Sequence, residues 1–280
     1  MGDIFFEDHY IKVGNVNTRY WLAGEKGSTV ILLHGINCHV EFWEKNIAAL
    51  AQEHRVFAVD IVGFGLTEKP AIDYTFQQMT DFVIDFMNAM NIDKASLVGN
   101  SMGGGITMMV AARAPERVEK IVLVNSSGLG KRMSLMVRLL TLPVIGEVLT
   151  KPSRQGVVRQ MQMCLYDHSQ ASDDFIDRAA AIGKLSDKQR SVLSVLRGGC
   201  NIFGMKKKVV IDFSECIKRI SAPILVIWGR QDRINPVSDG EAAVKRMGDV
   251  KLHIIDQADH CPQIDKPEEF NATVLDFLRD

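Results

Sequence analysis

One serine, one aspartate and one histidine stand where together they could carry out nucleophilic acyl transfer. Ser101 lies in the segment 99–103 (GNSMG), between an apolar run and a stretch of helical character. In a strand–turn–helix element of this kind the serine hydroxyl projects from a sharp turn, and the flanking glycines allow close backbone approach. A plain glycine-rich turn can share this pentapeptide, so the interpretation depends on the elements around it.

The serine needs a base, and the base needs an acid to orient it. His260 lies in the loop 256–262, after the last apolar run, and is the candidate base. Asp232 follows the apolar run 224–228 and is the candidate acid. The order serine, acid, histidine along the chain favours a catalytic triad of Ser101, Asp232 and His260.

Asp232 has another possible role, and other acidic residues lie near His260 in the sequence. Asp232 could instead cap the turn that follows it, since aspartate is common in turns. Asp256 and Asp259 are too close to the histidine in sequence to approach it naturally. Asn125 follows the preceding apolar run but carries no charge. Asp232 is therefore the acid reached by chain order and elimination.

A tetrahedral intermediate needs two hydrogen-bond donors for its oxyanion. The backbone N–H of Met102, directly after the nucleophile, is the first expected donor. The second is expected from the loop after the apolar run 29–33, with Ile36 as first choice and Asn37 as second. His34, in the same loop, is expected to be a structural brace.

The elements that must position these residues alternate between short apolar runs and helical stretches. An antiparallel hairpin is predicted at 10–13 and 18–23. Short runs that are apolar on both faces are typical of parallel strands covered by helices, and such runs recur at 29–33, 56–61, 95–98, 121–124, 224–228 and 252–255. Helical periodicity is found at 76–90, 102–114, 241–247 and 267–278. This alternation predicts a doubly wound, mostly parallel α/β sheet.

One long segment, 128–215, breaks this rhythm and has a helical pattern rich in methionine. We expect it to be a helical cap inserted into a core domain formed by 1–127 and 216–280. The segment holds 14 Lys and Arg against 8 Asp and Glu, a net charge of +6, whereas the rest of the chain carries −7. A basic cap would suit an acidic substrate, although a solvated surface explains the charge more simply.

The composition is that of an ordinary globular protein, with 46% hydrophobic and 24% charged residues. The net charge of −1 gives no reason to expect nucleic acid, and no apolar run approaches the roughly 20 residues of a spanning helix. Five scattered cysteines favour free thiols, and we expect a cytoplasmic protein with a small-molecule substrate. No metal or organic cofactor is expected, and the oligomeric state stays open.

The set of motifs resembles the α/β-hydrolase superfamily over essentially the whole chain. The matching pieces are LLHG at 32–35, VDIVGFGLTEKP at 59–70, VGNSMGG at 98–104, WGRQDRINP at 228–236 and DHCPQIDKPEEF at 259–270. The resemblance implies that Asp60 is a structural anchor. It is nearest to cap-bearing esterases and lipases, and to the meta-cleavage-product hydrolases that cut carbon–carbon bonds.

Likeness to the carbon–carbon hydrolases implies substrate contacts from Asn100 and Arg178. Two departures point the other way: that group usually has Gly-Pro-Gly where 36–39 reads INCH, and a tryptophan where Cys261 stands. Cys261 is itself a candidate to line the substrate site. The sequence therefore favours hydrolysis of a carboxylic ester of a small-to-medium apolar substrate, with carbon–carbon hydrolysis as the alternative and a low-turnover, receptor-like binding protein as a third hypothesis.

Overall fold

A computed structural model describes residues 6–185, 187–247 and 250–279. Within these ranges eight strands form one sheet, in the order β1-β2-β4-β3-β5-β6-β9-β10. Their bounds are β1 (His9–Val13), β2 (Val16–Ala23), β3 (Thr29–Leu33), β4 (Arg55–Val59), β5 (Ala95–Asn100), β6 (Val118–Val124), β9 (Ile224–Gly229) and β10 (Lys251–Ile255). From β4 to β10 every neighbouring pair is parallel, whereas β1 and β2 are antiparallel. The predicted α/β-hydrolase architecture, a mostly parallel α/β sheet, is confirmed.

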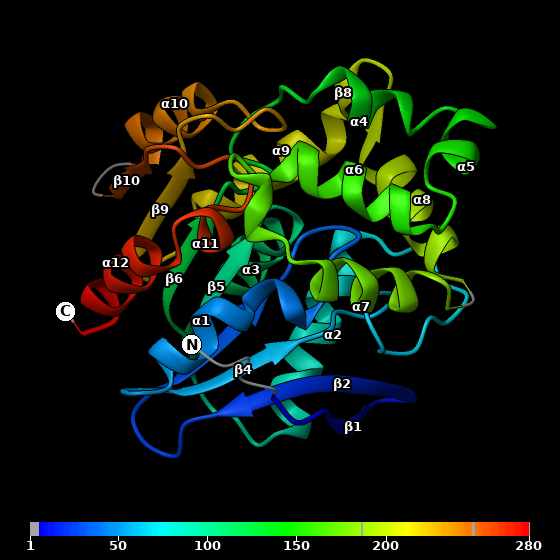
Figure 1. Ribbon diagram of the computed structural model, residues 1–280. Helices are drawn as coiled ribbons and strands as arrows, with labels where there is room; N and C mark the ends of the chain where they lie inside the picture. The colour runs from blue at the N-terminus through cyan, green and yellow to red at the C-terminus, as the bar shows by residue number, and fades with distance from the viewer. Residues whose placement is uncertain (1–5, 186, 248–249, 280) are drawn as a thin grey trace.

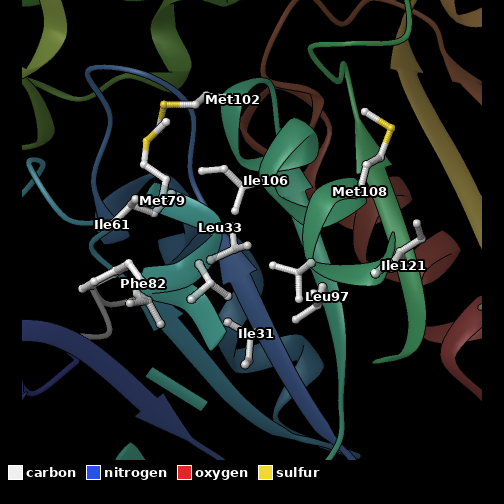
Figure 2. Close-up of a cluster of buried hydrophobic side chains, with 14 of the residues drawn as sticks. Ile31, Leu33, Ile61, Met79, Phe82, Leu97, Met102, Ile106, Met108 and Ile121 are labelled. Carbon is white, nitrogen blue, oxygen red and sulfur yellow. The ribbon is translucent and has the colours of Figure 1, made fainter. Parts of the chain in front are cut away.

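Alternate residues of the central strands enter two separate cores. Ile31 and Leu33 of β3 belong to one hydrophobic cluster, while Val30 and Leu32 belong to the other. Because side chains alternate across a strand, a run that is apolar at every position can serve both faces of the sheet. Figure 2 shows the first cluster, in which Ile31 and Leu97 from the strands face Ile106 from a helix.

Helices cover both faces of the sheet (Figure 1). One layer holds α1 (Glu44–Leu50), α11 (Pro262–Asp265) and α12 (Pro267–Arg279). The other holds α2 (Phe76–Ala89), α3 (Met102–Arg113) and α10 (Val237–Met247), and α2 begins with a capping box between Thr75 and Gln78. Short 3-10 turns lie at η1 (Val40–Trp43), η2 (Pro115–Arg117) and η3 (His168–Gln170).

Between β6 and β9 the chain is mainly helical and gathers on one side of the sheet (Figure 1). This segment contains α4 (Leu135–Leu139), α5 (Ile145–Leu149), α6 (Arg154–Cys164), α7 (Asp173–Gly183), α8 (Lys188–Gly199), the strand pair β7 (Cys200–Asn201) and β8 (Gly204–Met205), and α9 (Lys207–Ile217). The last helix, α9, packs on α3, and its buried Phe213 meets Phe76 edge to face. The expected boundary between the inserted segment and the core domain, at residue 215, therefore falls inside α9.

Candidate active site

The nucleophile candidate Ser101 occupies a tight turn between β5 and α3. Its backbone has φ 54° and ψ −114°, a conformation that is strained for a residue with a side chain. A Cβ at Gly99 would lie 2.3 Å from the Gly103 carbonyl oxygen, and a Cβ at Gly103 would lie 2.1 Å from the Leu33 carbonyl oxygen. Only glycine fits at these two positions, so the sequence pattern follows from the close approach of backbone to backbone.

Neighbouring backbone groups hold this turn in place. The Ser101 N–H donates to the Val124 carbonyl at 2.9 Å, and the Ser101 carbonyl accepts from the Ser127 N–H at 2.9 Å. Both partners lie at the end of β6, so the next strand supports the strained residue. The turn leads directly into α3, whose first N–H groups have no partner within the helix and favour negative charge.

The expected oxyanion donors lie at the same end of the sheet. In the described part of the chain, neither the Met102 N–H nor the Ile36 N–H donates to a protein acceptor. Both residues line the cavity that contains Ser101. Asn37, the second choice, has a positive φ of 60°, and its side-chain amide donates to Gln160 of α6 at 2.6 Å. The geometry leaves the Met102 and Ile36 N–H groups free to bind an oxyanion.

The histidine and the aspartate are hydrogen-bonded to each other. His260 Nδ1 lies 3.0 Å from Asp232 Oδ2 and 3.2 Å from Oδ1. Burial disfavours the imidazolium, but the charge and hydrogen bond of Asp232 outweigh it and raise the pKa of His260 to about 9. This pair is arranged to accept a proton on Nε2 and to stabilise the resulting cation.

Asn125, which the sequence excludes as the acid, supports the Asp232 carboxylate. The Asn125 side-chain amide donates to Asp232 Oδ2 at 2.6 Å, while Asp232 Oδ1 accepts from the N–H groups of Ile234 and Asn235 at 2.8 and 2.9 Å. Asn125 cannot be the acid, but it orients the acid. Its place directly after β6 is the one sequence signal that could have indicated this role.

The other two acidic residues near His260 are engaged elsewhere. Asp259 forms an ion pair with Arg233 and accepts from the His260 backbone N–H at 2.8 Å. Asp256 forms an exposed ion pair with Arg230. Neither is bonded to the imidazole, which agrees with the choice of Asp232.

The three expected substrate-contact residues have different positions. Asn100 and Cys261 line the cavity, but the Asn100 side-chain amide donates to the His260 carbonyl at 3.0 Å and so also holds the histidine loop. The Cys164 thiol and burial both raise the pKa of Cys261, whose thiol therefore stays protonated.

Arg178, the third of these residues, does not reach the cavity. It forms ion pairs at 2.8 Å with Glu44 of α1 and with Asp174 of its own helix, α7. The expected contact of Arg178 with substrate is thus not supported, because its guanidinium is already neutralised by Glu44 of α1 and Asp174 of α7.

Two buried residues brace the loops around the nucleophile. His34 Nε2 accepts from the Ile61 N–H at 3.1 Å and Nδ1 lies 2.7 Å from the Gly35 carbonyl, so Nδ1 carries the proton. Burial lowers the pKa of His34 to about 3, which excludes a charged role near neutral pH. Asp60 accepts from the Val40 and Leu66 N–H groups, each at 2.8 Å.

Ser101 and His260 open into a cavity of about 490 Å³ between the sheet and the segment that follows β6. The wall formed by the segment after β6 is mainly apolar and includes Met133, Val137, Leu140, Met163, Val192 and Leu196. Among the described residues no cluster of three metal-ligating side chains is found. No helix in the described ranges is both long enough and apolar enough to cross a membrane. The cavity can thus enclose a medium-sized, largely apolar molecule beside the nucleophile.

Comparison with known proteins gives the class of this protein. Residues 28–267 match the family model of the alpha/beta hydrolase fold, and the chain belongs to this family. The matched range includes the candidate residues Ser101, Asp232 and His260.

Particular relatives narrow the comparison within that family. The chain is 31% identical over 277 residues to a 2-hydroxy-6-oxo-6-(2'-aminophenyl)hexa-2,4-dienoic acid hydrolase of Metapseudomonas resinovorans, covering 98% of this chain and 91% of that protein. It is 30% identical over 264 residues to a 2-hydroxy-6-oxo-6-phenylhexa-2,4-dienoate hydrolase of Comamonas testosteroni, covering 92% and 89%. A crystal structure of a meta-cleavage product hydrolase from Pseudomonas fluorescens IP01 superposes with a TM-score of 0.81 at 27% identity, covering 97% of each chain.

Proposed function

We propose that this protein hydrolyses a carbon–carbon bond in a 6-substituted 2-hydroxy-6-oxohexa-2,4-dienoate. The observation that carries the proposal is the likeness over nearly the whole chain to hydrolases of such dienoates. The motifs alone put ester hydrolysis first, on account of the departures at 36–39 and at Cys261. Ile36, Asn37, Cys38 and Cys261 lie in the cavity wall, so in this proposal the departures bear on which 6-substituent fits rather than on the bond that is cut.

The proposed reaction uses the polar groups that meet in the cavity. Once the 2-hydroxy group has passed its proton to C5, the C6 carbonyl is a ketone that Ser101 can attack while His260 takes the hydroxyl proton. The N–H groups of Met102 and Ile36 bind the oxyanion. Cleavage of the C5–C6 bond leaves electrons conjugated to the C2 carbonyl, and His260 returns a proton. Water then releases the acyl group as a carboxylic acid.

The segment 128–215 supplies the lid in this proposal. Its apolar side chains form one wall of the cavity, and they would keep bulk water from the acyl-enzyme and from the dienolate. Apolar and methionine side chains in that wall adapt well to a hydrophobic 6-substituent. We place the substrate's apolar part there.

The test is decolorisation of a yellow 2-hydroxy-6-oxo-6-phenylhexa-2,4-dienoate by the full-length protein. Ser101→Ala is expected to lower kcat/KM by about 10³-fold or more, because the triad acts as a unit. Ser214→Ala removes an exposed hydroxyl on α9 and is the matched control, expected to match wild type. Absence of decolorisation by wild type would refute the proposal.

Ester hydrolysis is the second candidate, and the hydrogen-bonded Asp232–His260 pair beside Ser101 favours it equally. A series of p-nitrophenyl esters from acetate to octanoate tests it on the same preparations. If kcat/KM for an ester exceeds that for the dienoate, the ester is the better assignment. Turnover well below ~1 s⁻¹ on both substrate classes would indicate the receptor-like alternative.

A further inference from the structure

A buried lysine faces the cavity without a partner. Lys188 is the first residue of α8, is only 6% exposed and lines the cavity that contains Ser101. Within the described ranges, no carboxylate, carbonyl or other acceptor receives a hydrogen bond or ion pair from its ammonium group. Lys188 Nζ is not among the fully enclosed side-chain atoms that lack a partner in the described chain, so the ammonium opens to the cavity. A cation on a largely buried side chain without a protein acceptor needs an explanation, because buried polar groups are nearly always hydrogen-bonded.

The nearest carboxylates do not neutralise this charge because they already have partners. Asp60 is held by two backbone N–H groups and by Arg19 at 3.3 Å. Glu41 pairs with Arg19 at 2.7 Å and with His39. Burial lowers the pKa of Lys188 to about 8, so the ammonium form still predominates at neutral pH.

Other cations of segment 128–215 differ from Lys188, and Arg138, whose buried Nε has no partner, does not line the cavity. Arg178 and Arg197 are neutralised by Glu44 and Glu147, each at 2.8 Å. Lys151 and Arg159 also border the cavity, but they are exposed to water. Among the cations of segment 128–215 that line the cavity, Lys188 is therefore the one whose side chain is buried.

Lys188 lines the same cavity as the nucleophile and the loop that carries an oxyanion donor. Cys38 and Gly35 of that loop also line it, and the Cys38 sulfur lies 3.6 Å from the position of a Cβ on Gly35. Because Ser101 and Lys188 border one cavity, a single enclosed ligand can contact both.

We propose that Lys188 forms the anion-binding subsite of the cavity and pairs with a carboxylate on the substrate. The identification of this carboxylate as C1 of a dienoate rests on the proposed function; the subsite itself rests on the burial and the free ammonium. Lysine is a point charge rather than a planar fork, so it selects for negative charge with little demand on orientation. It takes the role that Arg178, fixed by Glu44, cannot fill.

Binding without turnover provides the first test. In a Ser101→Ala background, dissociation constants are measured calorimetrically for hexanoate and for hexan-1-ol, which differ in charge but hardly in size. Lys188→Met is expected to weaken hexanoate binding by about 10- to 100-fold, the range for loss of a charged hydrogen bond, and to leave hexan-1-ol within about 2-fold. Lys188→Arg is expected to retain the preference for hexanoate.

Lys184→Met, which removes an exposed cation four residues earlier, is the matched control and is expected to change neither constant. Equal loss for both ligands, or no loss for either, would overturn the proposal. If Lys188→Met gives no folded protein, Lys188→Gln removes the same charge and provides the same comparison.

Turnover provides the second test and separates the two proposals. With the phenyl dienoate, Lys188→Met is expected to raise KM by about 10- to 100-fold with kcat nearly unchanged, whereas the neutral 1-carboxamide of that substrate is expected to be unaffected. If wild type decolorises no dienoate, the proposed function fails, while the hexanoate measurement still decides the role of Lys188. A loss of kcat for both substrates would point to a structural role and contradict the subsite.

Discussion

At the residue scale, the environment of His260 sets the pH range in which the site can work. Its imidazole is buried and bonded to Asp232, which in turn is fixed by Asn125. Only the neutral imidazole can take the proton of Ser101, so activity rises as pH increases through the pKa of His260. Because Asp232 raises that pKa above its ordinary value of 6.5, the acid limb is expected above pH 6.5.

Asp232→Asn removes the negative charge and leaves burial, which favours the neutral ring. The acid limb of kcat/KM is therefore expected to move to lower pH, while kcat falls by about 10⁴-fold through loss of the orienting carboxylate. The measurement is a pH–rate profile of both proteins on one substrate. An acid limb that stays in place would show that Asp232 is not the group acting on His260.

At the element scale, the close approach of α3 to β3 fixes where the nucleophile stands. Gly103 lies against the Leu33 carbonyl, and Gly99 lies against Gly103. The helix can begin directly behind Ser101 only because neither residue carries a Cβ. Its free N–H groups then lie where the oxyanion forms.

Gly103→Ala is expected to destabilise the protein by about 1–3 kcal/mol, as overpacking of a tight interior does, and to lower activity through displacement of the turn. Gly198→Ala is the matched control in α8, where an added Cβ meets nothing within 4 Å. Removing a helical glycine there is expected to stabilise by about 0.5–1 kcal/mol. Urea unfolding gives both values, and equal effects at the two glycines would contradict the packing argument.

At the scale of the whole molecule, the loop that carries His260 is bonded to the helical segment between β6 and β9. The Arg233 guanidinium donates to the Gln162 and Leu165 carbonyls at 2.9 and 3.0 Å and pairs with Asp259 beside the histidine. The Cys261 N–H donates to the Cys164 carbonyl at 3.1 Å. These hydrogen bonds connect the position of the candidate base to the end of α6.

Arg233→Gln is expected to loosen this connection, since the shorter amide cannot make all three contacts. Faster hydrogen exchange at the amides of 164–167 and a fall in kcat/KM of about 10-fold are expected, in line with loss of charged hydrogen bonds. Arg230→Gln breaks an exposed ion pair with Asp256 and is the control, expected to change neither. Unchanged exchange in Arg233→Gln would contradict the coupling.

The sequence by itself determined the elements and the order of the chemistry. Short runs that are apolar on both faces of a strand predict the parallel sheet. The predicted bounds of β3 match the observed ones, Thr29–Leu33. The segment 99–103 predicts the turn at Ser101 because the close backbone approach in this turn requires glycine at 99 and 103. These features depend on neighbours within a few residues, and such neighbours can be read from the chain.

Only the tertiary structure decided how charged and polar groups pair. Asn125 meets Asp232 across 107 residues and Arg178 meets Glu44 across 134. The two partners of each pair lie on elements that are far apart in the sequence. No local sequence pattern predicts that these elements come into contact. The same holds for Lys188, whose surroundings are set by the packing of α8 against the core. Whether a charge is neutralised or faces a cavity depends on three-dimensional neighbours. The α/β-hydrolase family could therefore be predicted from the sequence, whereas the bond that is cut and the residues that select the substrate could not.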